Sequence, residues 1–122
     1  MKIESKDINY WVYPGLSFSL KKSIFRIAYA FLHTARKVRG DNNLCFSDIK
    51  RKTRKQEIVI LRQIYQSLLK KYTDMSFMEI GNITGWNGGY DHATVMHNCK
   101  VIENLLETNK KFRLTYGEFF NL

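Results

Sequence analysis

The spacing of apolar residues changes near position 19, and this change divides the chain into two parts. Before it, Ile8, Tyr10 and Val12 occupy every second position, and Pro14-Gly15 then turns the chain. The alternation predicts an extended or irregular N-terminal arm over 1–19, whose aromatic residues pack on the rest of the protein. A contact between two copies of the chain is the alternative use of this arm.

From Ser19 onward, apolar residues recur at spacings of three and four, which is the period of an α-helix. One stripe predicts a helix that ends at the turn 40–43, and the next predicts a long helix over about 55–72. Between them, we expect Ser47 to cap a short helical turn anchored by three apolar residues. The anchors are Leu44, Phe46 and Ile49, and the stripes are Ile24, Ile27, Ala28, Phe31, Leu32 and Ala35, then Leu61, Ile64, Tyr65, Leu68, Leu69 and Tyr72.

Capping residues mark two further helices. Ser76 and Glu79 stand in the S-x-x-E order of a capping box, which predicts a brief helix over 76–83. Asp91 follows two glycines and is expected to cap a helix that runs to about Thr108. Residues 109–122 predict a final short helix that folds back through its aromatic side chains. The apolar stripe of 91–108 is Val95, Cys99, Ile102 and Leu106, and the aromatic residues after it are Phe112, Tyr116, Phe119 and Phe120.

These elements predict an all-α fold, a bundle of about five to six helices over 20–122 that follows the arm. A chain of 122 residues with 44% hydrophobic residues suits one compact domain. It has neither the apolar run of a signal peptide nor the ~20 apolar residues that span a bilayer. Its two cysteines make no disulfide framework. We therefore expect a cytoplasmic protein with reduced thiols and no membrane partner.

Positive charge is concentrated in the middle of the chain. The net charge is +9, and the segment 50–71 contains eight basic residues against one acid, Glu57. Five of the eight fall within 50–55, where a predicted loop meets a helix: Lys50, Arg51, Lys52, Arg54 and Lys55. Such a loop can neutralise phosphates or place an Arg in the minor groove of DNA. A solvated, solubilising face is the alternative interpretation.

The helices predicted over 76–83 and 91–108 form a pair of the helix-turn-helix kind, whose second helix enters the major groove of DNA. Asp91 can accept a hydrogen bond from a cytosine amine, and the methyl of Ala93 can touch that of thymine. His92 also lies at the start of the second helix, and the hydroxyl of Thr94 suits a contact with a phosphate oxygen. Asp91 can equally be only an N-cap. Opposite the buried stripe lie His97, Lys100 and Asn104, which face DNA or water.

Residues 88–98 read Gly-Gly-Tyr-Asp-His-Ala-Thr-Val-Met-His-Asn. They resemble the signature of the DNA-binding domain of the bacterial replication initiator DnaA, Gly-Gly-Arg-Asp-His-Thr-Thr-Val-Leu-His-Ala, with seven of eleven positions identical. Upstream, 62–81 resembles a second stretch of that family without a gap. The similarity covers about 44–107, and it implies a DnaA domain IV fold, similar to the Trp repressor, that binds double-stranded DNA.

The resemblance also implies roles for individual residues. Arg54 stands where a family Arg reads the minor groove, and Arg62 and Gln63 match residues that help bind DNA. Residues 91–93 match the base-reading trio, and Thr94 matches a backbone contact. The amides of Phe77 and Met78 begin the helix that abuts a phosphate in the family. With the basic loop and the exposed side of 91–108, the expected DNA contacts are Lys52, Arg54, Lys55, Arg62, Gln63, Phe77, Met78, Asp91, His92, Ala93, Thr94 and Lys100.

Three departures from the family imply a different sequence preference. The stretch between Gly81 and Asp91 is three residues longer than the family turn, which can re-aim the recognition helix. Tyr90 replaces the signature Arg, and Ala93 replaces a Thr that reads bases. The preferred site is therefore expected to differ from the DnaA box even where the docking mode persists.

The ATPase of an initiator has no counterpart in this sequence, because no G-x-x-x-x-G-K-[ST] motif occurs in it. We expect a stand-alone DNA-binding domain that controls replication or transcription, of the kind a phage or a mobile element encodes. No cofactor, metal or enzymatic activity is expected, since no ligand set surrounds His92, His97 and Cys99. The alternative is a protein-interaction module that kept the fold, such as an antagonist of an initiator, with a replication or regulatory protein as its partner. The oligomeric state does not follow from the sequence.

Overall fold

The computed structural model describes residues 18–50, 55–84 and 90–121, and this part of the chain is helical with no strand. The all-α prediction is therefore confirmed. Of the predicted arm, only residues 18 and 19 are described, and both belong to the first helix. The elements are α1 (Phe18–Arg39), α2 (Phe46–Lys50), α3 (Gln56–Tyr72), α4 (Phe77–Thr84), α5 (His92–Thr108), α6 (Lys110–Tyr116) and the 3₁₀ turn η3 (Gly117–Phe120).

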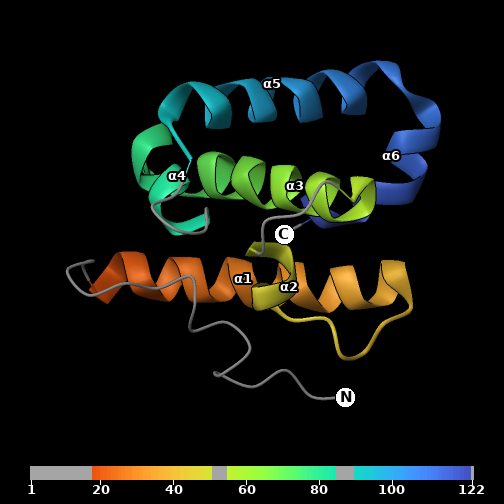
Figure 1. The fold of residues 1–122 in the computed structure, drawn as a ribbon, viewed down its shortest axis with the longest axis horizontal. Helices are drawn as coiled ribbons and strands as arrows, with labels where there is room; N and C mark the ends of the chain where they lie inside the picture. The colour runs from red at the N-terminus through yellow and green to blue at the C-terminus, as the bar shows by residue number, and fades with distance from the viewer. Residues whose placement is uncertain (1–17, 51–54, 85–89, 122) are drawn as a thin grey trace.

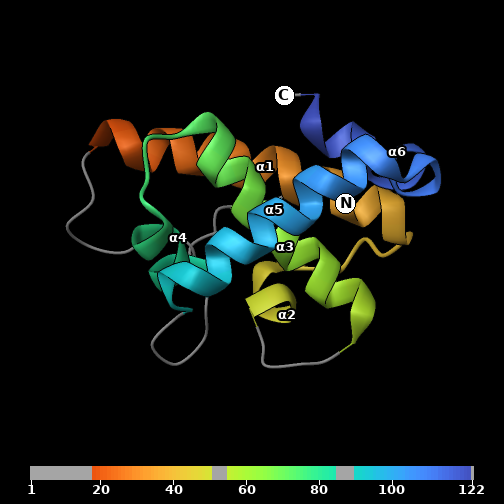
Figure 2. The same cartoon turned by 90° about the horizontal axis from the view of Figure 1, so that it is seen from above.

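The helices stack in layers, with α5 above α3 and α3 above α1 (Figure 1). Because α3 lies in the middle, it contacts α1, α2, α4 and α5. Helix α4 adjoins the start of α5, and α6 adjoins its end (Figure 1). Seen from above, α5 crosses α3 obliquely (Figure 2). The central helix therefore sets the position of both members of the predicted helix-turn-helix pair.

Four aromatic rings from distant parts of the chain form the centre of the core. Tyr65 of α3 lies 4.9 Å from Phe31 of α1 and 5.3 Å from Phe46 of α2, measured between ring centroids. Phe31 also lies 5.4 Å from Phe119 of η3. These offset and tilted pairs add to the free energy gained by burying the rings. The cluster fixes α2 and η3, which are too short to be stable by themselves.

The capping box at the start of α4 is confirmed. The N–H of Ser76 donates to Oε1 of Glu79 over 3.0 Å, and the N–H of Glu79 donates to Oγ of Ser76 over 3.1 Å. At the end of α1, Gly40 takes a φ of 65°, a left-handed conformation that glycine adopts without strain. The turn predicted at 40–43 is therefore also confirmed.

The prediction that Ser47 caps α2 is wrong. Helix α2 begins at Phe46, so Ser47 lies inside it, and Cys45 stands just before the helix. The cap is made by Asp48, whose Oδ2 accepts from the N–H of Cys45 over 3.1 Å. A carboxylate is the stronger acceptor for an unpaired amide at a helix start, and its charge suits the positive end of the helix dipole.

Candidate nucleic-acid interface

The start of α5 is fixed by Asp91, as predicted from its place after two glycines. Its Oδ1 accepts from the N–H of Thr94 over 2.7 Å. Hydrogen bonds from the side chain and the backbone of Thr94, together with the nearby His92, lower the pKa of the Asp91 carboxyl. The carboxylate therefore stays charged at the end of the helix where the dipole is positive.

Helix α5 presents one polar side to solvent. His92 and Ala93 in its first turn are exposed, and Thr94 is half-buried. The apolar stripe faces α3 and α4, with Val95 and Ile102 buried and Cys99 and Leu106 half-buried. Farther along the exposed side lie His97, Lys100 and Asn104. The predicted division between a core-facing and an outward-facing side is confirmed.

Tyr90, which lies just before the cap of α5, contacts α4 at Gly81. The N–H of Tyr90 donates to the carbonyl of Gly81 over 3.0 Å. A Cβ on Gly81 would lie only 2.0 Å from the carbonyl oxygen of Tyr90. No side chain fits at this contact, so residue 81 must be glycine for the two helices to meet as they do. The inserted residues 86 and 87 lie outside the described part of the chain.

Phe77 and Met78 form the first turn of α4. Their backbone amides belong to the group at a helix start that has no partner within the helix. Met78 is 61% exposed, whereas Phe77 is half-buried beneath Lys70, whose Nζ lies 4.5 Å from the ring centroid. This turn is open to solvent at Met78, which suits the phosphate contact that the resemblance to the DnaA family implies.

Arg62 occupies a different position from that expected of a surface contact. Its side chain is 6% exposed, and its Nε and Nη2 donate to the carbonyl of Ile49 over 3.0 and 2.8 Å. The guanidinium carbon also lies 5.6 Å from the ring centroid of Tyr90. Burial lowers the pKa of Arg62, and Tyr90 acts in the opposite direction. Arg62 thus holds the end of α2 next to Tyr90, which lies two residues before α5.

The basic segment is described only at its margins. Lys55, the residue before α3, is exposed, while Lys52 and Arg54 lie outside the described residues. In Figure 2 the start of α3, helix α2 and the start of α5 lie along the same edge of the molecule. The end of α2 and the start of α3, which flank residues 51–54, therefore lie on the side where α5 begins.

Gln63 belongs to a polar group that the sequence analysis missed. It is half-buried on α3 and donates to Asn98 of α5. Asn98 in turn donates to Gln66, which is completely buried. A signal was available, because Gln66 lies one turn after Arg62 and between Tyr65 and Leu68 of the apolar stripe. A buried polar side chain needs partners, and these come from another helix.

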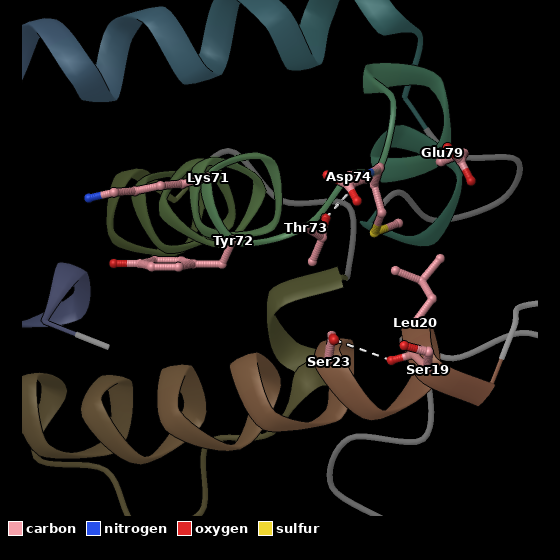
Figure 3. Close-up of a pocket in the computed structure, with 9 residues that line it drawn as sticks. Ser19, Leu20, Ser23, Lys71, Tyr72, Thr73, Asp74 and Glu79 are labelled. Carbon is pink, nitrogen blue, oxygen red and sulfur yellow. Dashed lines mark hydrogen bonds between the residues drawn. The ribbon is translucent and has the colours of Figure 1, made fainter.

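A hollow of about 470 Å³ lies between the start of α1 and the turn from α3 to α4 (Figure 3). Its polar groups are largely engaged locally. Ser23 donates to the carbonyl of Ser19, and Thr73 accepts from the N–H of Met75. None of the predicted DNA contacts within the described residues lines it. This hollow is therefore separate from the candidate interface.

A metal centre or a membrane span would indicate another class of protein. In residues 18–50, 55–84 and 90–121, no group of three or more His, Cys, Asp or Glu side chains could hold a metal ion. Across the same residues, no helix has the length and apolar character needed to cross a bilayer.

Comparison with known proteins identifies the family. The family model described as "Bacterial dnaA protein helix-turn-helix" matches residues 35–102, which is more than half of the chain. The chromosomal replication initiator protein DnaA of Bacteroides thetaiotaomicron is 43% identical over 76 residues, which are 62% of this chain and 16% of that protein. The DnaA of Porphyromonas gingivalis is 45% identical over 65 residues, 53% of this chain and 13% of the relative.

The DnaA of Picosynechococcus is 42% identical over 64 residues, 52% of this chain and 14% of the relative. The chain thus spans about a sixth or less of the length of these curated relatives. No solved structure matches it. The match to the family model includes α2, α3, α4 and most of α5, which are the helices that build the candidate interface. The chain therefore belongs to the helix-turn-helix family of the bacterial DnaA protein.

Proposed function

We propose that this protein binds double-stranded DNA, with the first turn of α5 in the major groove. The observation that supports this most is the exposed, capped start of α5 in a helix-turn-helix fold. In such folds, the N-terminal residues of the second helix meet base edges. Asp91, His92 and Ala93 are the proposed base contacts, and Thr94 the proposed contact to a phosphate.

The remaining contacts are proposed to be with the DNA backbone. The first-turn amides of α4, at Phe77 and Met78, suit a phosphate. Lys55 and Lys100 are exposed cations that can neutralise phosphates, as can Lys52, while Arg54 is proposed for the minor groove. Gln63 is proposed to contact DNA from α3. For Arg62 we propose an indirect role, since it is buried and holds α2 in place.

The proposed biological role is control of replication or transcription, because the relatives are named as chromosomal replication initiators. The proposed functional unit is the helical domain from about residue 20 to 122. Tyr90 and Ala93 differ from the family signature, so the preferred duplex is proposed to differ from the DnaA box.

Selection from a pool of random duplexes tests the proposal. We expect a preferred sequence to be enriched, and to be bound at least ~1,000-fold more tightly than a random duplex at physiological salt. His92→Ala should reduce this discrimination by about 1–3 kcal/mol for each base that the imidazole reads. His97, an exposed histidine five positions farther along α5, gives the control His97→Ala. Failure of the protein to retain any duplex would show that the fold serves another purpose, such as binding a protein.

A further inference from the structure

A chain of hydrogen bonds joins three helices of the candidate interface, α3, α4 and α5. Nε2 of Gln63 on α3 donates to Oδ1 of Asn98 on α5 over 3.1 Å. Nδ2 of Asn98 donates to Oε1 of Gln66 on α3 over 2.8 Å. Nε2 of Gln66 donates to Oγ1 of Thr84 on α4 over 2.9 Å, and Thr84 donates to the carbonyl of Ile80 over 2.7 Å. We call these four side chains the amide relay.

The amide relay has a fixed direction. The hydroxyl of Thr84 has one hydrogen, which it donates to the carbonyl of Ile80. Thr84 must therefore accept from the amino group of Gln66. The side-chain oxygen of Gln66 then faces Asn98, so Asn98 must donate to it from its amino group. The oxygen of Asn98 is left for the amino group of Gln63. The buried end of the relay therefore decides how the amide of Gln63 is oriented.

Burial makes the relay costly to disturb. Gln66 and Thr84 are 0% exposed, whereas Gln63 and Asn98 are half-buried. An amide left without a partner in the interior loses its hydration and gains nothing in return. Asn98 supplies both the donor for Gln66 and the acceptor for Gln63. It is thus the residue of α5 that ties the recognition helix to α3 at a defined rotation.

Asn98 is also a departure of this chain from the family signature, in which alanine holds the position. An alanine has no side-chain donor or acceptor and would leave Gln66 and Gln63 without these bonds. Asn98 lies one helical turn after Thr94, on the side of α5 that meets α3. The relay in this form therefore depends on a residue that the signature does not contain.

We propose that Asn98 is a positioning residue for DNA recognition, which sets the amide of Gln63 and the rotation of α5 without touching the duplex. This inference rests on the proposed duplex binding. The half-buried Gln63 then presents its amide to DNA in one orientation only. The consequence is sequence discrimination rather than general affinity for DNA.

Asn98→Ala tests the proposal, with Asn104→Ala as the matched control on the exposed side of the same helix. In the free protein, side-chain amide resonances in NMR spectra should shift for Gln63 and Gln66 in Asn98→Ala and stay unchanged in the control. The affinity ratio between selected and random duplexes should fall about tenfold, the usual effect of removing one hydrogen bond. The salt dependence of binding should not change, since no phosphate contact is removed.

A double-mutant cycle separates positioning from stability. If Asn98 acts through Gln63, then Gln63→Ala should cost less discrimination in the Asn98→Ala background than in the wild type. Should Asn98→Ala fail to fold, Thr84→Val breaks the relay at its other end, and Thr84→Ser restores the hydroxyl. The first should then reduce discrimination, and the second should keep it.

The outcomes distinguish this inference from the proposed function. If the wild-type protein retains no duplex, the proposed function fails, and positioning for DNA recognition fails with it, although NMR still reports whether Asn98 orients Gln63. If the wild type selects a sequence and Asn98→Ala discriminates as well as Asn104→Ala, only the inference fails. An equal loss of affinity for selected and random duplexes would assign Asn98 a structural role and overturn the inference.

Discussion

At the residue scale, the N-cap bond of Asp91 is compatible with the base contact proposed for the same side chain. One of its oxygens accepts from the N–H of Thr94, and a carboxylate offers about four lone-pair positions in all. Capacity therefore remains for a donor from a cytosine amine in the proposed complex. The side chain is held in place by its own helix, so no rotamer freedom has to be lost when DNA binds.

The charge of Asp91 gives a prediction on pH dependence. Its pKa is lowered in the folded protein, so its contribution to stability is complete above about pH 3.9, the value for an unfolded chain, and is lost as the pH falls through the lowered pKa. The backbone N–H resonance of Thr94 should report this titration in NMR spectra, with a midpoint below about 3.9. Asp91→Asn keeps an N-cap without a charge and should abolish the transition. A midpoint at or above that value would show that the cap bond does not favour the charged form.

At the element scale, short helices are held by contacts with longer ones. Helix α2 has five residues and ends beside the buried guanidinium of Arg62, which donates two hydrogen bonds to the carbonyl of Ile49. A carbonyl in the last turn of a helix has no partner within the helix, so the guanidinium satisfies it. The same Arg62 lies against Tyr90, just before α5. One side chain of α3 thus connects the end of α2 to the residues just before α5.

The junction of α4 and α5 depends on Gly81, and this gives a second prediction. Gly81→Ala places a Cβ against the carbonyl of Tyr90, at a distance of 2.0 Å if nothing moves. We expect a loss of about 1–3 kcal/mol in the free energy of unfolding, typical of overpacking at a site with no room. Urea denaturation followed by circular dichroism measures it. Gly117→Ala is the control, because its Cβ would lie 3.8 Å from the nearest atom, Cγ of Arg113. Equal stability of the two variants would mean that the junction adapts.

For the whole molecule, periodic apolar residues were enough to predict the helical layers. The stripes at 24–35 and 61–72 are buried, because spacing of three and four places their residues on one side of a helix. The exception is Tyr72 at the end of α3, which is 37% exposed. Caps at Ser76 and Asp91 were predictable for a similar reason, since they depend on residues only three positions apart. The cap predicted at Ser47 is wrong because α2 begins one residue earlier, at Phe46, so Ser47 lies inside the helix.

Contacts between distant residues could not be predicted in this way. The buried place of Arg62 and the amide relay join residues 13 to 35 positions apart, and only the packing of α2, α4 and α5 on α3 brings them together. From its position in the motif, Arg62 was expected to contact DNA at the surface. In the structure its side chain is buried and donates to the carbonyl of Ile49. The burial of Gln66 likewise follows from three helices at once.

Charge is the property of the whole molecule on which the proposed binding to DNA depends most directly. Besides the segment 50–71, helix α1 has six Lys and Arg residues and no acid, yet it lies in the layer farthest from α5 (Figure 1). If net charge alone determined the affinity for DNA, removing cations from α1 would weaken binding as much as removing cations near α5. If direct contact with phosphates determines it, only the cations near α5 matter, because counterions are released only where phosphates are neutralised.

Two double variants with the same loss of charge decide between these mechanisms. Lys55→Ala with Lys100→Ala removes exposed cations beside α5, and Lys22→Ala with Arg26→Ala removes exposed cations from α1. For the first pair, the slope of log K against log salt should become shallower by about 0.9 for each phosphate that is no longer neutralised. For the second pair it should stay as in the wild type. Fluorescence anisotropy with a labelled duplex between about 50 and 200 mM salt measures both. Equal slopes in the two variants would show that duplex binding depends on the overall charge, and that the layer containing α5 has no special part in it.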